Sequence, residues 1–217
     1  MKLNEAEDFY FVCCLTSLFH KTQMIETLRH IDTSVFHFIN GTLANPILDV
    51  LCAVLRGKTF LVIFYAAVAV RLFQLYPKQF IRIALAGAIT FLLTDQISSH
   101  VIKYFFHRIR PCNNPAIGAR LVIEQCGSGF SFVSAHAANS FGIAQFLIFI
   151  LRFNLQSSIF NHQSFTTLLL LTWASLVSFS QIYVGVHFPA DVIGGALVGI
   201  FIGTSTAFVS KRFFIDI

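Results

Sequence analysis

The sequence predicts an all-α fold: a polytopic membrane helix bundle of five to six transmembrane helices, preceded by N-terminal interfacial helices. Of its 217 residues, 56% are hydrophobic and 12% are charged, which is too apolar for a water-soluble domain of this length. The apolar residues also gather in runs long enough to cross a bilayer. We expect one integral-membrane domain over residues 1–217, with an interfacial and first-helix region at 1–57 and a helix bundle at 58–217.

The balance of charge is basic, with a net charge of +5 and a pI of about 9.1. A net positive charge is typical of proteins that bind nucleic acid. Here, however, the lysines and arginines lie mostly between the apolar runs and form no basic stripe. Membrane topology accounts for them better. We therefore expect a lipid bilayer as a partner and no nucleic acid.

The N-terminal region has the least regular pattern. The apolar spacing from Ile31 to Ile39 is typical of an amphipathic helix at the membrane interface, and residues 41–46 interrupt it. The next segment, Ile47 to Leu55, is apolar but too short to span the bilayer alone. It fits either half of a bent first helix or a segment packed into the bundle.

Five later segments have the length and apolar character of membrane spans. In chain order they are Thr59–Tyr76, Phe80 to about Tyr104, Ser134–Leu151, Phe165–Ile182 and Asp191–Val209. Because successive spans cross in opposite directions, the loop after the second span and the connection after the fourth lie at the same membrane face. Every polar cluster of the chain is therefore expected at that face.

A polar loop from His107 to Ser131 separates the second span from the third. Cys112 and Cys126 enclose much of this loop. A bridge between them makes sense only in an oxidising compartment. We predict that this disulfide forms, which in the chain-entropy model stabilises the fold by about 3 kcal/mol.

The first polar cluster lies at the start of this loop. Lys103 and Arg110 are seven residues apart, which on a helix places them on one face, and Pro111 then ends or redirects the chain. Lys103 is set deep in its span, so snorkelling alone explains it less well. We interpret His107 and Arg108 as the basic residues that routinely flank membrane helices.

The second and third clusters begin the last spans at the same face. Ser134 is expected to cap a helix whose free first-turn N–H groups form an anion site beside His136. Pro189 predicts a further helix from about Phe188, so that His187 and Asp191 face the same side. The carboxylate can then hold one ring nitrogen while the other serves as a nucleophile or base.

A simpler interpretation of the third cluster stays open at this point. Asp191 alone fits a first-turn acid that complements the helix dipole, and His187 fits a polar residue at the interface. Taken together, however, the clusters offer two cations, a helix N-terminus, two histidines and a carboxylate. Such a set suits a phosphoryl group, because the cations and amides can hold its oxygens and no metal is required.

These clusters resemble the motifs of the type 2 phosphatidic acid phosphatase superfamily, which is related to the vanadium haloperoxidases. The family motifs are Lys-x6-Arg-Pro, Pro-Ser-Gly-His and Ser-Arg-x5-His-x3-Asp. Here they read Lys103 with Arg110-Pro111, then Val133-Ser134-Ala135-His136, then Ser180-Gln181 with His187 and Asp191. The resemblance covers residues 95–195 well and the N-terminal third hardly at all.

The resemblance implies a membrane lipid phosphatase that needs no cofactor. His187 would form a phosphohistidine, Asp191 would orient it, and His136 would protonate the leaving group. The phosphate oxygens would be bound by residues at the remaining motif positions, namely Lys103, Arg110, Ser134, Ala135 and Gln181.

Two motif positions depart from the family pattern. Ala135 replaces a glycine and adds only a methyl group. Gln181 replaces an arginine, which removes a permanent charge and a bidentate donor. This departure leaves three alternatives open: a slower enzyme, one tuned to another head group or, in the extreme, a pseudoenzyme. Because both histidines, Asp191, Lys103 and Arg110 remain, we expect an active enzyme.

The resemblance leaves several phosphorylated lipids open: undecaprenyl pyrophosphate, phosphatidylglycerol phosphate, phosphatidic acid and lipid A phosphates. Basic residues favour the face opposite the site, which predicts a multi-pass protein of a bacterial inner membrane with its site on the periplasmic or outer side. One alternative is a carrier or flippase that binds phosphorylated lipid without chemistry. Another treats His136, His187 and Asp191 as metal ligands of a hydrolase.

Overall fold

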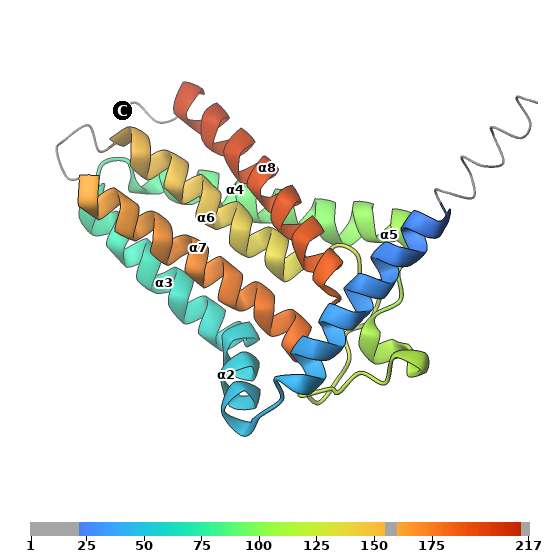
Figure 1. The fold of residues 1–217 in the computed structure, drawn as a ribbon. Coiled ribbons are helices and arrows are strands. Elements are labelled where there is room, and N and C mark those ends of the chain that lie inside the picture. The colour runs from blue at the N-terminus through green and yellow to red at the C-terminus, as the bar shows by residue number, and fades with distance from the viewer. Residues whose placement is uncertain (1–21, 155–159, 214–217) are drawn as a thin grey trace, which may run out of the picture.

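The computed structural model describes residues 22–154 and 160–213, and these contain helices and loops but no strand. Long helices pack side by side, and the loops and short helices gather mainly at one end (Figure 1). The predicted all-α architecture is confirmed over this part of the chain. The first 21 residues of the expected N-terminal region lie outside it.

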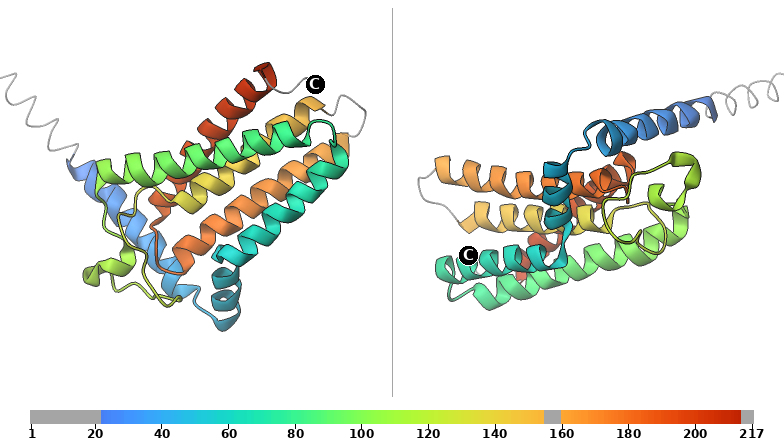
Figure 2. Two further views of the ribbon diagram at one scale, coloured as in Figure 1. Left: turned by 180° about the vertical axis from the view of Figure 1, so that it is seen from behind. Right: turned by 90° about the horizontal axis from the view of Figure 1, so that it is seen from below.

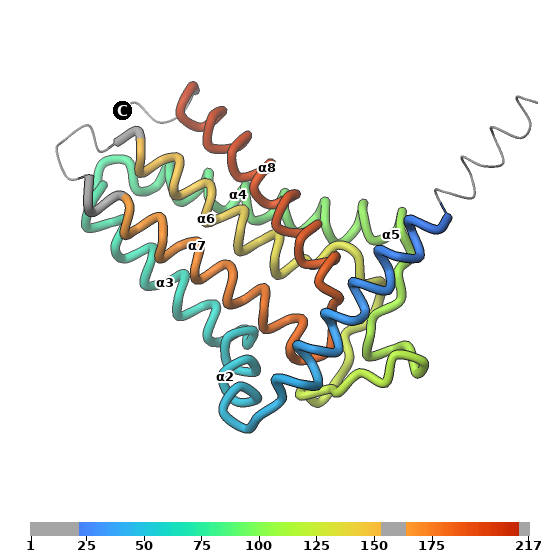
Figure 3. The backbone as a smooth tube through the Cα atoms, in the orientation of Figure 1, coloured from blue at the N-terminus to red at the C-terminus, as the bar shows by residue number. Residues whose placement is uncertain are grey.

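The long helices follow the predicted segments closely. They are α3 (Lys58–Leu75), α4 (Phe80–Gln96), α6 (Ala135–Asn154), α7 (Phe160–Tyr183) and α8 (Pro189–Phe213). After α4 the chain continues through a π-helical stretch, η2 (Ile97–Ile102), into the short helix α5 (Lys103–Phe106). The tube in Figure 3 shows this continuous path, which forms one helix of 27 residues.

Within the described ranges, four helices are long and apolar enough to cross a membrane, and a bent N-terminal pair would make a fifth. These four match four of the five predicted spans. The exception is α6, which lies among α4, α7 and α8 and carries His136, Asn139 and Ser140 in its first turns. Because other helices surround α6, it does not need an apolar surface facing lipid.

The N-terminal region folds as two helices joined by a sharp bend. The first is Thr22–Thr42, which ends in a π-helical turn, η1 (Phe38–Thr42), and is called the interfacial helix below. The second is α2 (Pro46–Arg56), which is bent by 114° from the first and capped by the side chain of Asn45. Both earlier interpretations of the 47–55 segment hold in part, because α2 is half of a bent pair and also packs on α7.

The interfacial helix is amphipathic, as predicted. Its buried side carries Asp32, Phe36 and Asn40, of which Phe36 packs against Phe188 at the start of α8. An adjoining face exposes an apolar stripe with helical spacing: Met24, Leu28, Ile31, Val35 and Phe38. Figures 1 and 2 show this helix crossing the bundle end where α8 begins.

Close packing of α6 against α8 fixes how their first turns meet. A Cβ atom on Gly199 would lie 2.3 Å from the carbonyl oxygen of Ala138, and one on Gly203 would lie 2.3 Å from that of Gly142. Small residues at this spacing let two helix backbones approach closely. The two helices run parallel, and the Ser134 N–H donates to the Asp191 carbonyl at 2.9 Å.

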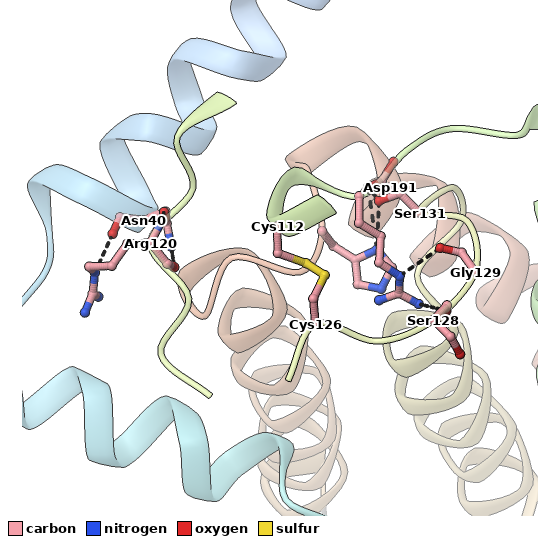
Figure 4. The surroundings of a disulfide bond; sticks show 10 residues. Asn40, Cys112, Arg120, Cys126, Ser128, Gly129, Ser131 and Asp191 are labelled. Atoms are coloured by element: carbon pink, nitrogen blue, oxygen red, sulfur yellow. Dashed lines mark hydrogen bonds and ion pairs between the residues drawn. A yellow bond between two sulfur atoms is a disulfide. The ribbon is translucent and has the colours of Figure 1, made fainter. Parts of the chain in front are cut away.

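The loop after α5 contains two 3-10 turns, η3 (Pro111–Asn113) and η4 (Pro115–Ile117). The predicted disulfide joins Cys112 to Cys126, with Cα atoms 5.9 Å apart (Figure 4). Asn40 of the interfacial helix donates to the carbonyl of Arg120 at 2.8 Å, which ties the loop to the N-terminal region. The disulfide therefore closes the loop on itself, and Asn40 holds the loop against the N-terminal region.

Candidate active site

The first motif is complete in space, but its geometry differs from the helical prediction. Lys103 is the first residue of α5, whereas that helix ends at Phe106 and His107 takes a left-handed conformation with φ of 48°. Arg110 is thus reached by a non-helical segment, and it does not lie two helical turns from Lys103. Pro111 begins η3, as expected for a residue that redirects the chain.

Arg110 is buried and held by the loop that follows it. Its Nε donates to the carbonyl of Gly129 at 3.3 Å, and Nη2 approaches the carbonyl of Ser128 at 3.4 Å. A Cβ atom on Gly127 would lie 3.2 Å from Nη1, so the loop passes close to the guanidinium. Among the described residues, neither Arg110 nor Lys103 forms an ion pair within 4 Å.

The third motif places His187 in the turn between α7 and α8, and Asp191 in the first turn of α8. His187 Nδ1 lies 3.5 Å from Asp191 Oδ2. The same oxygen accepts hydrogen bonds from the Phe188 N–H at 2.8 Å and from the Ser131 hydroxyl. Figure 4 shows Ser131 next to Asp191. The carboxylate is therefore fixed at the Nδ1 side of the ring.

Burial controls the charge of His187, whose side chain is almost completely enclosed. Loss of hydration lowers the pKa of His187 to about 4, because it disfavours the imidazolium more than the Asp191 carboxylate favours it. The ring is consequently neutral at pH 7. The Asp191 carboxylate beside Nδ1 favours the tautomer with the proton on Nδ1, which places the lone pair on Nε2.

Arg108 has a role that the sequence did not indicate. We interpreted it as a routine flanking residue, but its Nη1 lies 2.7 Å from Asp191 Oδ1 and its Nη2 lies 2.5 Å from Asp32 Oδ2. Asp32 Oδ1 in turn accepts the Ala190 N–H at 2.7 Å. Arg108 also lies over the ring of Phe188, 4.1 Å from its centroid. The flanking interpretation of Arg108 is therefore wrong.

The second motif is placed as predicted. Ser134 precedes α6, and its hydroxyl is 3.5 Å from the Ala137 N–H, a weak N-cap contact. Ala135 and His136 are the first two helical residues, whose N–H groups have no acceptor within the helix. The charges of Lys103 and Arg110 act on His136 and also on His187, which brings the motifs into one electrostatic cluster.

Gln181, at the remaining motif position, is fully buried in α7. Its Nε2 donates to the Val177 carbonyl at 3.5 Å and to the Ser180 hydroxyl at 3.3 Å, both in its own helix. Its Oε1 is buried without a partner. In the described ranges, no group of three His, Cys, Asp or Glu side chains is placed so that it could hold a metal ion.

The pattern of residues and the fold both match known proteins. The model of the PAP2 superfamily matches residues 83–214. The chain belongs to the PAP2 superfamily. Together with the apolar helices, this makes it a multi-pass membrane protein.

Two curated relatives resemble this PAP2 protein over most of its length. The lipid A 4'-phosphatase of Bacteroides thetaiotaomicron is 32% identical over 193 residues, which cover 87% of this chain and 81% of that protein. The lipid A 4'-phosphatase of Porphyromonas gingivalis is 31% identical over 182 residues, covering 82% and 72%.

The fold matches the crystal structure of a transmembrane PAP2-type phosphatidylglycerolphosphate phosphatase from Bacillus subtilis. The TM-score is 0.65 at 20% identity, and the match covers 94% of each chain.

Proposed function

We propose that this PAP2 protein hydrolyses the phosphate ester of a membrane lipid through a phosphohistidine on His187. The observation that supports this most directly is the buried His187–Asp191 pair beside two cations that form no ion pair within the described residues. A neutral nucleophile next to uncompensated positive charge suits attack on a phosphate anion. Lys103, Arg110 and the first-turn N–H groups of α6 would bind its oxygens.

In the first step, the Nε2 lone pair of His187 attacks phosphorus and forms a P–N bond as the P–O bond to the lipid breaks. Asp191 stabilises the charge that develops on the ring, because Nδ1–H faces its carboxylate. His136 would enter this step as the imidazolium, stabilised by the negative charge of the bound phosphate dianion. It gives its proton to the departing lipid oxygen, which leaves as an alcohol.

In the second step, neutral His136 accepts a proton from water while the water oxygen attacks phosphorus. The P–N bond breaks, and its electron pair returns to Nε2 of His187. Inorganic phosphate is released, and both histidines regain their starting protonation states. No metal ion is needed, since the protein's own cations and amides neutralise the phosphate oxygens.

Within this function, Asp32 is expected to act as a positioning residue through Arg108. In Asp32→Asn the side chain keeps an oxygen for the Ala190 N–H but loses its charge toward Arg108. Arg108 should then hold Asp191 less rigidly. Because a charged hydrogen bond contributes about 1.5–3 kcal/mol, we expect kcat to fall about tenfold with little change in KM.

The matched control is Asp49→Asn, which removes another N-terminal carboxylate that pairs with a loop arginine. Asp49 Oδ1 lies 2.9 Å from Arg120 Nη1, and neither residue touches the His187–Asp191 pair. Steady-state kinetics should give a kcat near that of the parent for Asp49→Asn. Equal losses in the two variants would show that Asp32 acts only by holding the fold together.

The first substrate we propose is lipid A carrying a 4'-phosphate, because both relatives that align over most of this chain bear that activity in their names. The phosphate of such a lipid lies at the membrane interface, where the site's end of the bundle is expected. Phosphatidylglycerol phosphate is the comparison substrate, since it is the lipid named for the matching crystal structure.

Purified protein in detergent should release phosphate when given a panel of phosphorylated lipids. We expect the fastest release from 4'-phosphorylated lipid A, resistance to a strong chelator, and inhibition by vanadate, which imitates pentavalent phosphorus. Binding of these lipids without any release of phosphate would instead support a carrier. Loss of activity in the chelator would support a metal-dependent hydrolase.

We also propose that the site faces the outside of a bacterial inner membrane. Lys78, Arg82, Arg152, Lys211 and Arg212 lie toward the opposite end, which is the cytoplasmic side under the positive-inside rule. The Cys112–Cys126 disulfide in the site loop agrees with this orientation, because such bonds persist in an oxidising compartment.

A further inference from the structure

Gln181 leaves the phosphate site without one positive charge that the family motif supplies from α7. Its donors are already engaged with Val177 and Ser180 of its own helix, so little hydrogen-bonding capacity remains for a ligand. A neutral amide is also a weaker partner for phosphate than a guanidinium. If the site binds a phosphate dianion, another cation should compensate for this loss.

The C-terminal end of α2 brings a candidate cation to this part of α7. Leu55 packs against Val177 and Trp173, and Cys52 packs against Tyr183. The contacted residues of α7 all lie within about two helical turns of Gln181. Arg56, the last residue of α2, follows Leu55 directly and is therefore delivered beside the same stretch of α7.

Arg56 carries hydrogen-bonding capacity that the protein does not use. Its Nε is buried without an acceptor, and among the described residues its guanidinium has neither an ion pair nor a hydrogen bond. A guanidinium has five N–H donors, and burying one unpaired is costly. By contrast, Arg108 and Arg120 each have a carboxylate within 3 Å.

Electrostatics place the charge of Arg56 in the same cluster as the site residues. It lies close enough to Arg110 and His136 for its charge to act on both. Like charges repel, so cations gather in a protein interior only where an anion compensates them. Asp191 is already engaged by Arg108, and a bound phosphate is the remaining anion of suitable chemistry.

We propose that Arg56 is a phosphate-binding residue that supplies, from α2, the positive charge missing at Gln181. This inference rests on the proposed function and deepens it. Arg56 lies outside residues 83–214, the part of the chain that matches the family model. The ligand class is a phosphate monoester dianion bound by Arg56 and Arg110 together.

The test compares Arg56→Gln with Lys58→Gln, which removes an exposed positive charge two residues further along the chain. We expect Arg56→Gln to lower kcat/KM for the phosphorylated lipid about 100-fold, and Lys58→Gln to leave it near the parent value. Inorganic phosphate should also raise the Tm of the parent and of Lys58→Gln. It should not raise the Tm of Arg56→Gln. A parent-like kcat/KM or phosphate shift in Arg56→Gln would overturn the proposal.

A second experiment restores the arginine of the family motif at position 181. Gln181→Arg should recover much of the lost kcat/KM when combined with Arg56→Gln, and should add little to the parent. If Arg56→Gln does not fold, Arg56→Met carries the same test, because methionine removes the charge and all the N–H donors but keeps an unbranched side chain. Unchanged phosphate protection in Arg56→Met would contradict the proposal.

The phosphate-protection measurement separates this proposal from the proposed function, since it requires no turnover. A parent that releases no phosphate from any lipid contradicts the proposed activity, whereas a parent that inorganic phosphate does not protect contradicts the Arg56 site. Full activity of Arg56→Gln beside an inactive His187→Ala would overturn the Arg56 proposal and leave the phosphatase intact.

Discussion

Replacing His187 with alanine should abolish phosphate release, with a loss of about 10⁴-fold or more in kcat. Among the described residues, no other side chain is placed to act as the nucleophile next to Lys103 and Arg110. The imidazole is neutral and held by Asp191, so its removal takes away the nucleophile itself. The measurement is single-turnover phosphate release together with acid-quench detection of phosphoenzyme. Both signals should disappear.

Two other histidines sharpen this result. His100→Ala removes an exposed histidine of the same span as Lys103 and should leave kcat near the parent value. His136→Ala should lose activity on lipid substrates, but less on p-nitrophenyl phosphate, whose leaving group needs no proton. Phosphoenzyme formation in His187→Ala at the parent rate would show that another residue is the nucleophile.

The second large effect is expected for Asp191→Asn. Asp191 is fully buried and accepts from Ser131, Phe188 and Arg108, so its two oxygens serve three donors besides facing His187. An asparagine has only one acceptor oxygen, and its NH₂ group would oppose one of these donors. Breaking a buried ion pair costs about 3–5 kcal/mol, and the wrong histidine tautomer lowers kcat about 10⁴-fold in a comparable pair.

Thermal unfolding and kinetics should therefore both change in Asp191→Asn. Asp49→Asn is again the matched control, because Asp49 also accepts from a hydroxyl, that of Tyr183 at 2.7 Å, and pairs with an arginine, Arg120, outside the proposed catalytic pair. Its activity should remain near that of the parent. An Asp191→Asn protein with parent-like kcat would mean that His187 needs no carboxylate.

The sequence identified the site residues whose relationship is local. His187 and Asp191 are separated by one turn's length of chain, and Ser134 precedes its helix directly, so spacing and capping rules were sufficient. Lys103 and Arg110 were identified by motif, but their geometry was not, because His107 ends the helix in a left-handed conformation. A histidine gives no strong signal for that conformation.

Contacts across long chain separations could not be derived in the same way. Arg108 meets Asp32 across 76 residues and Asp191 across 83 residues, and each looks ordinary within its own segment. The available signal was the spacing along the interfacial helix, where Asp32, Phe36 and Asn40 follow one another at intervals of four residues. Polar residues on a face separate from the exposed apolar stripe indicate a specific protein contact.

The interfacial helix gives the bilayer a direct mechanical connection to the chemistry. Its apolar stripe has no protein partner in the described structure and is suited to the acyl-chain region, whereas Asp32 on the adjoining face bonds the first turn of α8. A change in bilayer thickness or packing that tilts this helix would therefore shift Arg108 relative to Asp191. Turnover should depend on the surrounding lipid or detergent as well as on the substrate. Detergents that do not cover the apolar stripe of the interfacial helix should lower kcat even when the bundle remains folded.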